Sequence, residues 1–137
     1  MSATDEYGRT VLHYAANDGD LEQVERLLAT EDVNARDNEG WTPLHFAAQS
    51  GQPEVVAILL DAGAQVDALN DKGMPPIYWA IMTPRGDQPA TIRLLRERGA
   101  DPTRETIKGY FGLSSPLDVV RDIGNKPDIV AEFADLL

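Results

Sequence analysis

One short pattern of residues recurs along this chain at a spacing that strongly limits its architecture. The glycines Gly8, Gly40 and Gly73 lie 32 and 33 residues apart, and similar residues surround each of them. A period of this length is typical of repeat proteins, in which a unit too small to fold alone buries its faces against its neighbours. The 137 residues have room for about four such units.

The repeated segments cover residues 5–16, 37–48 and 70–81, and a fainter copy begins at Ser115. Each is followed by a segment whose apolar residues recur at helical spacing. Prolines stand at or near the start of both segments in most units, where the missing N–H costs nothing because the first helical turn leaves it unbonded. Each unit is therefore predicted to be a turn, a short helix, a second turn and a longer helix.

The first segment of each unit resembles the ankyrin repeat, whose hallmark is Thr-Pro-Leu-His-x-Ala at a period of about 33. Residues 42–47 match at every fixed position, residues 10–15 lack only the proline, and residues 75–80 match loosely. The resemblance implies an all-α solenoid of stacked helix–turn–helix units with projecting hairpin loops. It implies one domain, 1–137, with end units as caps and approximate units 5–36, 37–69, 70–103 and 104–137.

Composition narrows the class of protein. The chain has 23 acidic and 12 basic residues, a net charge of −11 and no cysteine. This balance disfavours nucleic acid, whose phosphates need clustered Lys and Arg. No apolar run approaches the roughly 18 residues of a membrane span. We expect a soluble, cytoplasmic protein without a membrane or nucleic-acid partner.

The charge is uneven along the chain. Residues 1–69 carry a net −10 and residues 70–137 a net −1. A basic protein partner would explain this asymmetry, because such a field steers association. A general bias toward solubility explains it equally well.

The sequence contains no constellation of residues that could support catalysis. The two histidines, His13 and His45, both occupy the histidine position of the repeat, where the resemblance implies structural hydrogen bonds between neighbouring hairpins. The glycines follow the repeat and not a phosphate-binding pattern. We expect no catalytic, cofactor-binding or metal-binding residues, and no cofactor.

The resemblance implies instead a partner-binding surface on the concave face, made by hairpin tips and first helices. Trp41 follows a turn glycine, where we expect it to be exposed, and tryptophan is enriched among interface hot spots. Tyr7 and Met74 would flank it. The predicted partner-binding residues are Glu6, Tyr7, Arg9, Asn17, Asp18, Asn38, Glu39, Trp41, Gln49, Ser50, Asp71, Lys72, Met74, Met82 and Thr83.

Three further features each allow two interpretations. Tyr14, Phe46 and Trp79 form a second aromatic series within the first helices, either in the core between units or on the binding face. The loops at 83–89 and 103–114 are longer than the repeat requires, and either contact the partner or are tolerated insertions. In the second loop Tyr110 and Phe111 either bind a partner or cover the core of the fourth unit.

The predicted function is that of a non-catalytic protein–protein interaction module, a scaffold or adaptor, acting as a monomer. The alternative is a dedicated inhibitor or immunity protein that neutralises a basic toxin or enzyme. An enzyme is the remote third alternative.

Overall fold

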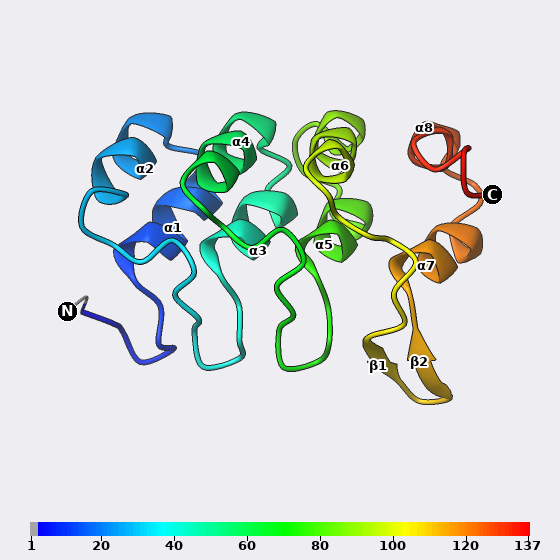
Figure 1. Cartoon of the computed structure of the whole chain (residues 1–137), viewed down its shortest axis with the longest axis horizontal. Coiled ribbons are helices and arrows are strands. Elements are labelled where there is room, and N and C mark those ends of the chain that lie inside the picture. The colour runs from blue at the N-terminus through cyan, green and yellow to red at the C-terminus, as the bar shows by residue number, and fades with distance from the viewer. Residues whose placement is uncertain (1–2) are drawn as a thin grey trace.

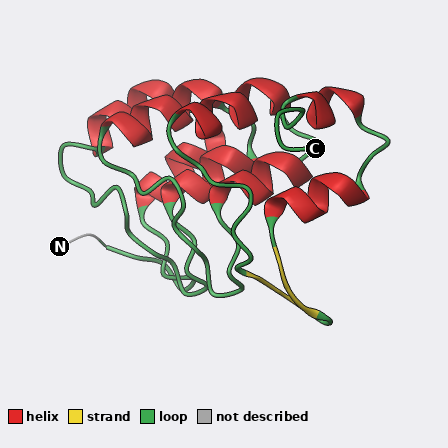
Figure 2. Ribbon diagram, turned by 45° about the vertical axis from the view of Figure 1, so that its right-hand side comes forward, coloured by secondary structure: helices red, strands yellow, loops and turns green. Residues whose placement is uncertain are grey.

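The computed structural model describes residues 3–137, so residues 1–2 of the predicted domain lie outside the described part. The helices form two rows, with α1, α3, α5 and α7 in one and α2, α4, α6 and α8 in the other (Figure 1). Loops project from the first row to one side (Figure 2). The helices are α1 Val11–Asp18, α2 Leu21–Leu27, α3 Pro43–Gln49, α4 Pro53–Asp61, α5 Pro76–Met82, α6 Gln88–Glu97, α7 Pro116–Asp122 and α8 Pro127–Ala131.

The predicted all-α stack of helix pairs is confirmed, with one addition. The long loop before the last pair contains a short antiparallel hairpin of β1 (Ile107–Gly109) and β2 (Gly112–Ser114). Between residues 3 and 137, no helix is both long enough and apolar enough to cross a membrane.

The first helices begin at capping boxes formed by the repeated pattern. At α3 the hydroxyl of Thr42 accepts the backbone N–H of His45, while the N–H of Thr42 donates to His45 Nδ1 at 3.1 Å. Two backbone donors of the first turn are thereby satisfied. Ser115 and Asp118 form the same box at α7, whereas Pro75 leaves α5 without one.

The histidines connect neighbouring units, as the resemblance implied. Because Nδ1 of each ring accepts a backbone N–H, Nε2 carries the proton and donates. His13 Nε2 lies 2.9 Å from the carbonyl oxygen of Trp41, and His45 Nε2 lies 3.0 Å from that of Met74. Each bond crosses to the hairpin of the next unit. Burial lowers the pKa of both rings, that of His45 to about 4.

Each of the first three hairpins is closed by an acidic or amide side chain and linked to the next hairpin through the backbone. Asp37 Oδ1 accepts the backbone N–H groups of Glu39 and Trp41. In the same way, Asn70 Oδ1 accepts the backbone N–H groups of Lys72 and Met74. Between hairpins, the N–H of Asp71 donates to the carbonyl of Glu39 at 3.0 Å. These bonds hold successive hairpin tips in register.

Close approach of the hairpins requires glycine in their turns. Gly73 has a φ of 75°, in the left-handed region that favours glycine, and a Cβ there would lie 1.7 Å from the carbonyl oxygen of Thr106. Since that oxygen belongs to the next hairpin's backbone, any side chain at Gly73 would force the last two hairpins apart.

A continuous apolar core runs between the two helix rows, from Leu12 and Val24 at one end to Ile129 and Phe133 at the other. Ile129 and Phe133, which belong to the last unit, are fully buried. Arg96 bonds Asp135 and lies over the Phe133 ring, which fixes the chain after α8 against α6.

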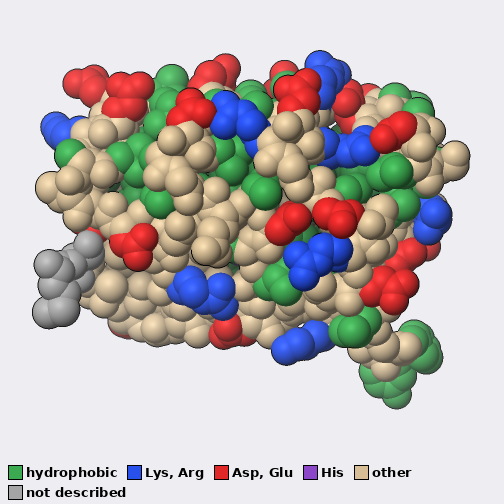
Figure 3. Space-filling model, in the orientation of Figure 1, with side chains coloured by type: hydrophobic (Ala, Val, Ile, Leu, Met, Phe, Trp, Pro, Cys, Tyr) green, Lys and Arg blue, Asp and Glu red, His purple; other side chains and the backbone are tan. Residues whose placement is uncertain are grey.

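The position of the β hairpin excludes one of the two interpretations of its aromatic residues. Tyr110 and Phe111 are 95% and 98% exposed at its tip, so they do not cover the core of the fourth unit. In Figure 3 this tip stands out from the body as a cluster of apolar side chains. Only Ile107, at the base of the hairpin, is buried.

The two phenylalanines of the last unit should differ sharply in their contribution to stability. Phe133→Ala is expected to lower the free energy of unfolding by about 3–5 kcal/mol, because it leaves a cavity in the core. Phe111→Ala should change it by about 0.5 kcal/mol or less, since the ring is exposed. Urea unfolding followed by circular dichroism measures both, and equal losses would contradict this placement.

The buried imidazole of His45 should make stability depend on pH. Its folded pKa of about 4 is below the ordinary 6.5, so below pH 6.5 the unfolded chain takes up a proton that the folded chain does not. The free energy of unfolding should therefore fall between pH 6.5 and 4, by about 3 kcal/mol from this group alone. His45→Gln keeps a donor and an acceptor without titrating. Denaturant unfolding across this range should give the variant a shallower slope, and identical slopes would refute the assignment.

Candidate functional site

The side of the first helix row that carries the hairpins is hollowed. Three hollows adjoin one another there, because the first two share Glu39 and the last two share Trp79. We call them together the trough. The first hollow, of about 350 Å³, is lined by Tyr7, Arg9, Asp37, Asn38 and Glu39. The middle hollow, of about 210 Å³, is lined by Glu39, Trp41, Asn70, Asp71, Lys72, Met74 and Trp79. The third hollow, of about 280 Å³, is lined by Gln49, Trp79, Met82, Thr83, Pro84 and Arg85.

An aromatic cluster lies at the centre of the trough. The ring of Trp41 lies 4.5 Å from that of Trp79 and 5.0 Å from that of Phe46, centroid to centroid. Trp41 is consequently half-buried, whereas the sequence led us to expect an exposed side chain. The physical reason is that its ring leans from the hairpin onto α3 and α5, where it covers two other rings.

The second aromatic series is divided between the trough and the core, because Trp79 lines the trough while Phe46 packs against the buried core. Phe46 and Trp79 are half-buried and contact Trp41, while Tyr14 is 40% exposed. The sequence left open whether these residues lie in the core between units or on the binding face. The hydrogen bond expected from His13 could have indicated their contact with Trp41, since it brings the backbone of Trp41 beside the first helices.

Arg9 contacts two aromatic rings and a carboxylate at the first hollow. Its guanidinium lies 4.8 Å from the Tyr7 ring centroid and 5.1 Å from that of Phe46, and its Nε is 3.4 Å from Asp37 Oδ2. Tyr14 donates a hydrogen bond to Asp5, which lowers the pKa of that carboxyl. These contacts hold several aromatic faces toward the trough.

The predicted partner-binding residues differ in their accessibility. Two are buried: Ser50 donates to the carbonyl oxygen of Asn17 at 2.7 Å, and Thr83 accepts the N–H of Arg85 at 3.1 Å. The half-buried ones are Arg9, Asn17, Trp41, Gln49 and Met74, and the exposed ones are Glu6, Tyr7, Asp18, Asn38, Glu39, Asp71, Lys72 and Met82.

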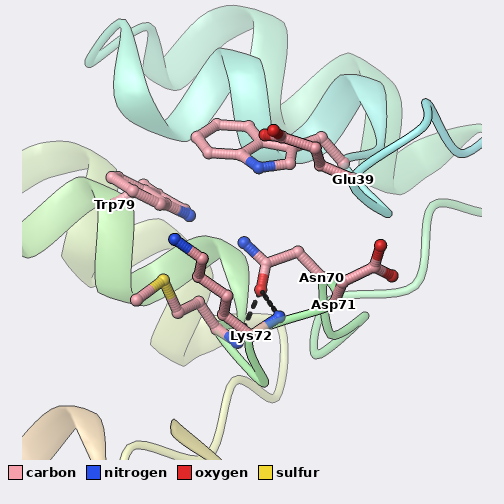
Figure 4. A pocket seen from close by; sticks show the side chains of 7 residues that line it. Glu39, Asn70, Asp71, Lys72 and Trp79 are labelled. Atoms are coloured by element: carbon pink, nitrogen blue, oxygen red, sulfur yellow. Dashed lines mark hydrogen bonds between the residues drawn. The ribbon is translucent and has the colours of Figure 1, made fainter. Parts of the chain in front are cut away.

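The middle hollow contains a polar atom without a partner. The indole Nε1 of Trp79 is buried and forms no hydrogen bond within residues 3–137 (Figure 4). A buried donor left unbonded costs about 1–3 kcal/mol. Asn70, which sequence reasoning did not select for the site, also lines this hollow.

The acidic excess of the first two units is divided between the hairpin side and the second-helix side. Its exposed carboxylates include a group on and before the second helices, and Figure 3 shows acidic side chains along that row. This group comprises Asp20, Glu22, Glu25, Glu54 and Asp61. The hairpins around the middle hollow carry Arg36, Lys72 and Lys108 beside Glu39 and Asp71.

The described residues offer little that could bind a metal ion. Across residues 3–137, no group of three or more His, Asp or Glu side chains lies close enough to hold one. His13 and His45 are buried and use both ring nitrogens in the hydrogen bonds described above.

Comparison with known proteins agrees with this architecture. The chain matches the family model "Ankyrin repeats (3 copies)" over residues 12–106. It is 39% identical over 74 residues to an ankyrin repeat protein of Rickettsia bellii (strain RML369-C), covering 54% of this chain and 30% of the relative. It is 40% identical over 108 residues to BCL-6 corepressor-like protein 1 of Homo sapiens, covering 77% of this chain and 6% of that protein. The chain thus spans less than a third of either relative.

Proposed function

The chain belongs to the ankyrin repeat family, and we propose that it is a non-catalytic interaction module that binds a partner protein in the trough. Ankyrin repeats are generally protein–protein interaction modules. The observation that carries the proposal is the contact between the half-buried indoles of Trp41 and Trp79, which opens to solvent at the middle of three adjoining hollows. Aromatic groups in such a position are the usual anchors of an interface.

The proposed contact residues are those predicted from the sequence, together with the aromatic residues that the fold adds. Thirteen of the fifteen predicted residues are exposed or half-buried, so a partner can reach them. Ser50 and Thr83 support the surface from below through their hydrogen bonds. Tyr14, Phe46 and Trp79 join the proposed surface because they lie in contact with Arg9 or Trp41.

The role of a scaffold or adaptor and that of a dedicated inhibitor use the same surface. Net charge supports a basic partner in either case, since −11 attracts such a protein over distances longer than direct contact. The inhibitor alternative fits a basic toxin or enzyme. We further propose that the chain acts as a monomer in the cytoplasm. Disulfides are rare there, and a fold without cysteine does not depend on them.

Affinity capture from the source cell, with the wild-type chain and the Trp41→Ala variant as parallel baits, tests the proposal. A protein retained by the wild type and lost with the variant is the expected result. A basic enzyme or toxin that loses its activity in the complex would identify the inhibitor role, and an unaffected activity would identify the scaffold role. Equal retention by the two baits would contradict binding in the trough.

Replacing the central indole should weaken binding more than it weakens the fold. Trp41→Ala is expected to cost about 2 kcal/mol or more of binding free energy, the size typical of a hot spot. Because the ring is half-buried, a smaller loss of stability should accompany it. Calorimetric titration against the captured partner measures the first effect, and thermal unfolding measures the second. Unchanged affinity, or loss of most of the helicity, would contradict the assignment.

The proposed steering of a basic partner should be sensitive to salt. Raising the ionic strength from 0.01 to about 0.15 M shortens the screening length from roughly 30 to 8 Å. The association rate should therefore fall, while the dissociation rate changes little. Surface plasmon resonance at several salt concentrations provides both rates, and an association rate independent of salt would count against a basic partner.

A further inference from the structure

The middle hollow of the trough brings together three hydrogen-bond donors that form no hydrogen bond within residues 3–137, although the carboxylates of Glu39 and Asp71 also line it. They are the indole Nε1 of Trp79, the ammonium of Lys72 and the side-chain amide nitrogen of Asn70. Among residues 3–137, Lys72 forms no ion pair and Asn70 uses only its oxygen, which accepts two N–H groups of its own turn. Asn70 is only 6% exposed, so its amide is held in place.

The donors face one another across the hollow. In Figure 4 the ammonium of Lys72 points toward the indole nitrogen of Trp79, and the amide nitrogen of Asn70 lies on the same side. Donors brought together in this way repel unless an acceptor lies between them. Lys72 is exposed and flexible, so its ammonium can move aside while the Trp79 and Asn70 groups stay in place.

Lys72 supplies the positive charge that an ionised acceptor in this hollow would need. Asp71 lies 3.5 Å from Arg36, and the ammonium of Lys108 bonds the main-chain carbonyl of Asp71 at 3.2 Å. Lys72 forms no ion pair among residues 3–137, although Glu39, which lines the same hollow, carries the opposite charge. Hydrogen bonds to an ionised acceptor are roughly twice as strong as those between neutral groups.

The walls favour an acceptor on a short apolar stem. Trp41, Met74 and the face of Trp79 supply apolar surface around a volume of about 210 Å³. We propose that the middle hollow binds the side chain of a glutamate from the partner protein, with its carboxylate between Lys72, Trp79 and Asn70 and its methylenes against the indoles. This proposal rests on the proposed function, because it names what the partner inserts into the trough.

A glutamate anchor is compatible with a partner that is basic overall. The acidic field that steers the partner arises from carboxylates over the whole surface of the first two units, whereas the anchor concerns atoms in contact inside one hollow. Glu39 opposes the incoming charge, and its removal should therefore strengthen binding of the glutamate side chain.

Three short peptides test the proposal on the full-length chain: acetyl-Gly-Glu-Gly-amide, the same peptide with Gln, and the same peptide with Arg. The readout is the pair of indole N–H signals in ¹H–¹⁵N NMR spectra, assigned with Trp41→Phe and Trp79→Phe. The Glu peptide should move the Trp79 indole proton downfield and saturate at millimolar concentration. The Gln peptide should bind about tenfold more weakly, because it lacks the charge-assisted bonds.

Matched variants separate the hollow from general charge effects. Lys72→Met keeps the apolar stem and should lower the affinity for the Glu peptide by about tenfold, the loss expected for a bond to a charged group. Lys126→Met makes the same change in net charge at an exposed site in the last unit and should leave the affinity unchanged. Glu39→Gln should raise the affinity.

The outcomes distinguish this inference from the proposed function. Equal binding of the Glu and Gln peptides, tighter binding of the Arg peptide, or an unmoved Trp79 indole would each overturn the glutamate anchor. An equal loss in Lys72→Met and Lys126→Met would overturn it as well. The proposed function would survive any of these results provided that Trp41→Ala still weakens binding of the captured partner.

Discussion

The hydrogen bond from an imidazole Nε2 to a main-chain carbonyl of the next unit is the interaction on which the rest of this structure depends. It ties His13 to Trp41 and His45 to Met74, and it joins the start of a first helix to the neighbouring hairpin. Each ring also accepts a backbone N–H at its own helix start. One side chain therefore begins a helix and positions the next unit. Because the bonded carbonyls belong to trough residues, the same interaction that stacks the units places the candidate site.

The third unit shows what happens where that interaction is missing. Tyr78 occupies the position of the histidine, and Pro75 replaces the capping threonine. The next hairpin is held instead by the hydroxyl of Thr106, which donates to the carbonyl of Gly73 at 2.7 Å, and by the N–H of Lys108, which donates to Lys72. These contacts concern the hairpins alone. The departure from the repeat thus coincides with the longest hairpin, the one with strands β1 and β2.

The sequence was sufficient to predict the repeat, its helix starts and the role of its histidines, because each depends on residues close together in one unit or on a pattern seen several times. The tilt of Trp41 onto Trp79 was not predictable in this way. It depends on how two rings 38 positions apart fill one hollow, which neither local pattern encodes. The same applies to Tyr110 and Phe111, whose exposure follows from how far the β hairpin projects. Charge counted along the chain placed the acidic excess in the first two units but could not show how it divides between the hairpin side and the second-helix row.

The stacking of Trp41 on Trp79 has a consequence for how this protein can be observed. These are the two tryptophans of the chain, and their ring centroids lie 4.5 Å apart. Fluorescence excited at the long-wavelength edge of the absorption band, where tryptophan absorbs and tyrosine does not, therefore reports on one place, the centre of the trough. The α7–α8 pair and the β hairpin contain no tryptophan and contribute little to that signal. The molecule carries a built-in optical probe at its candidate site, readable without any label.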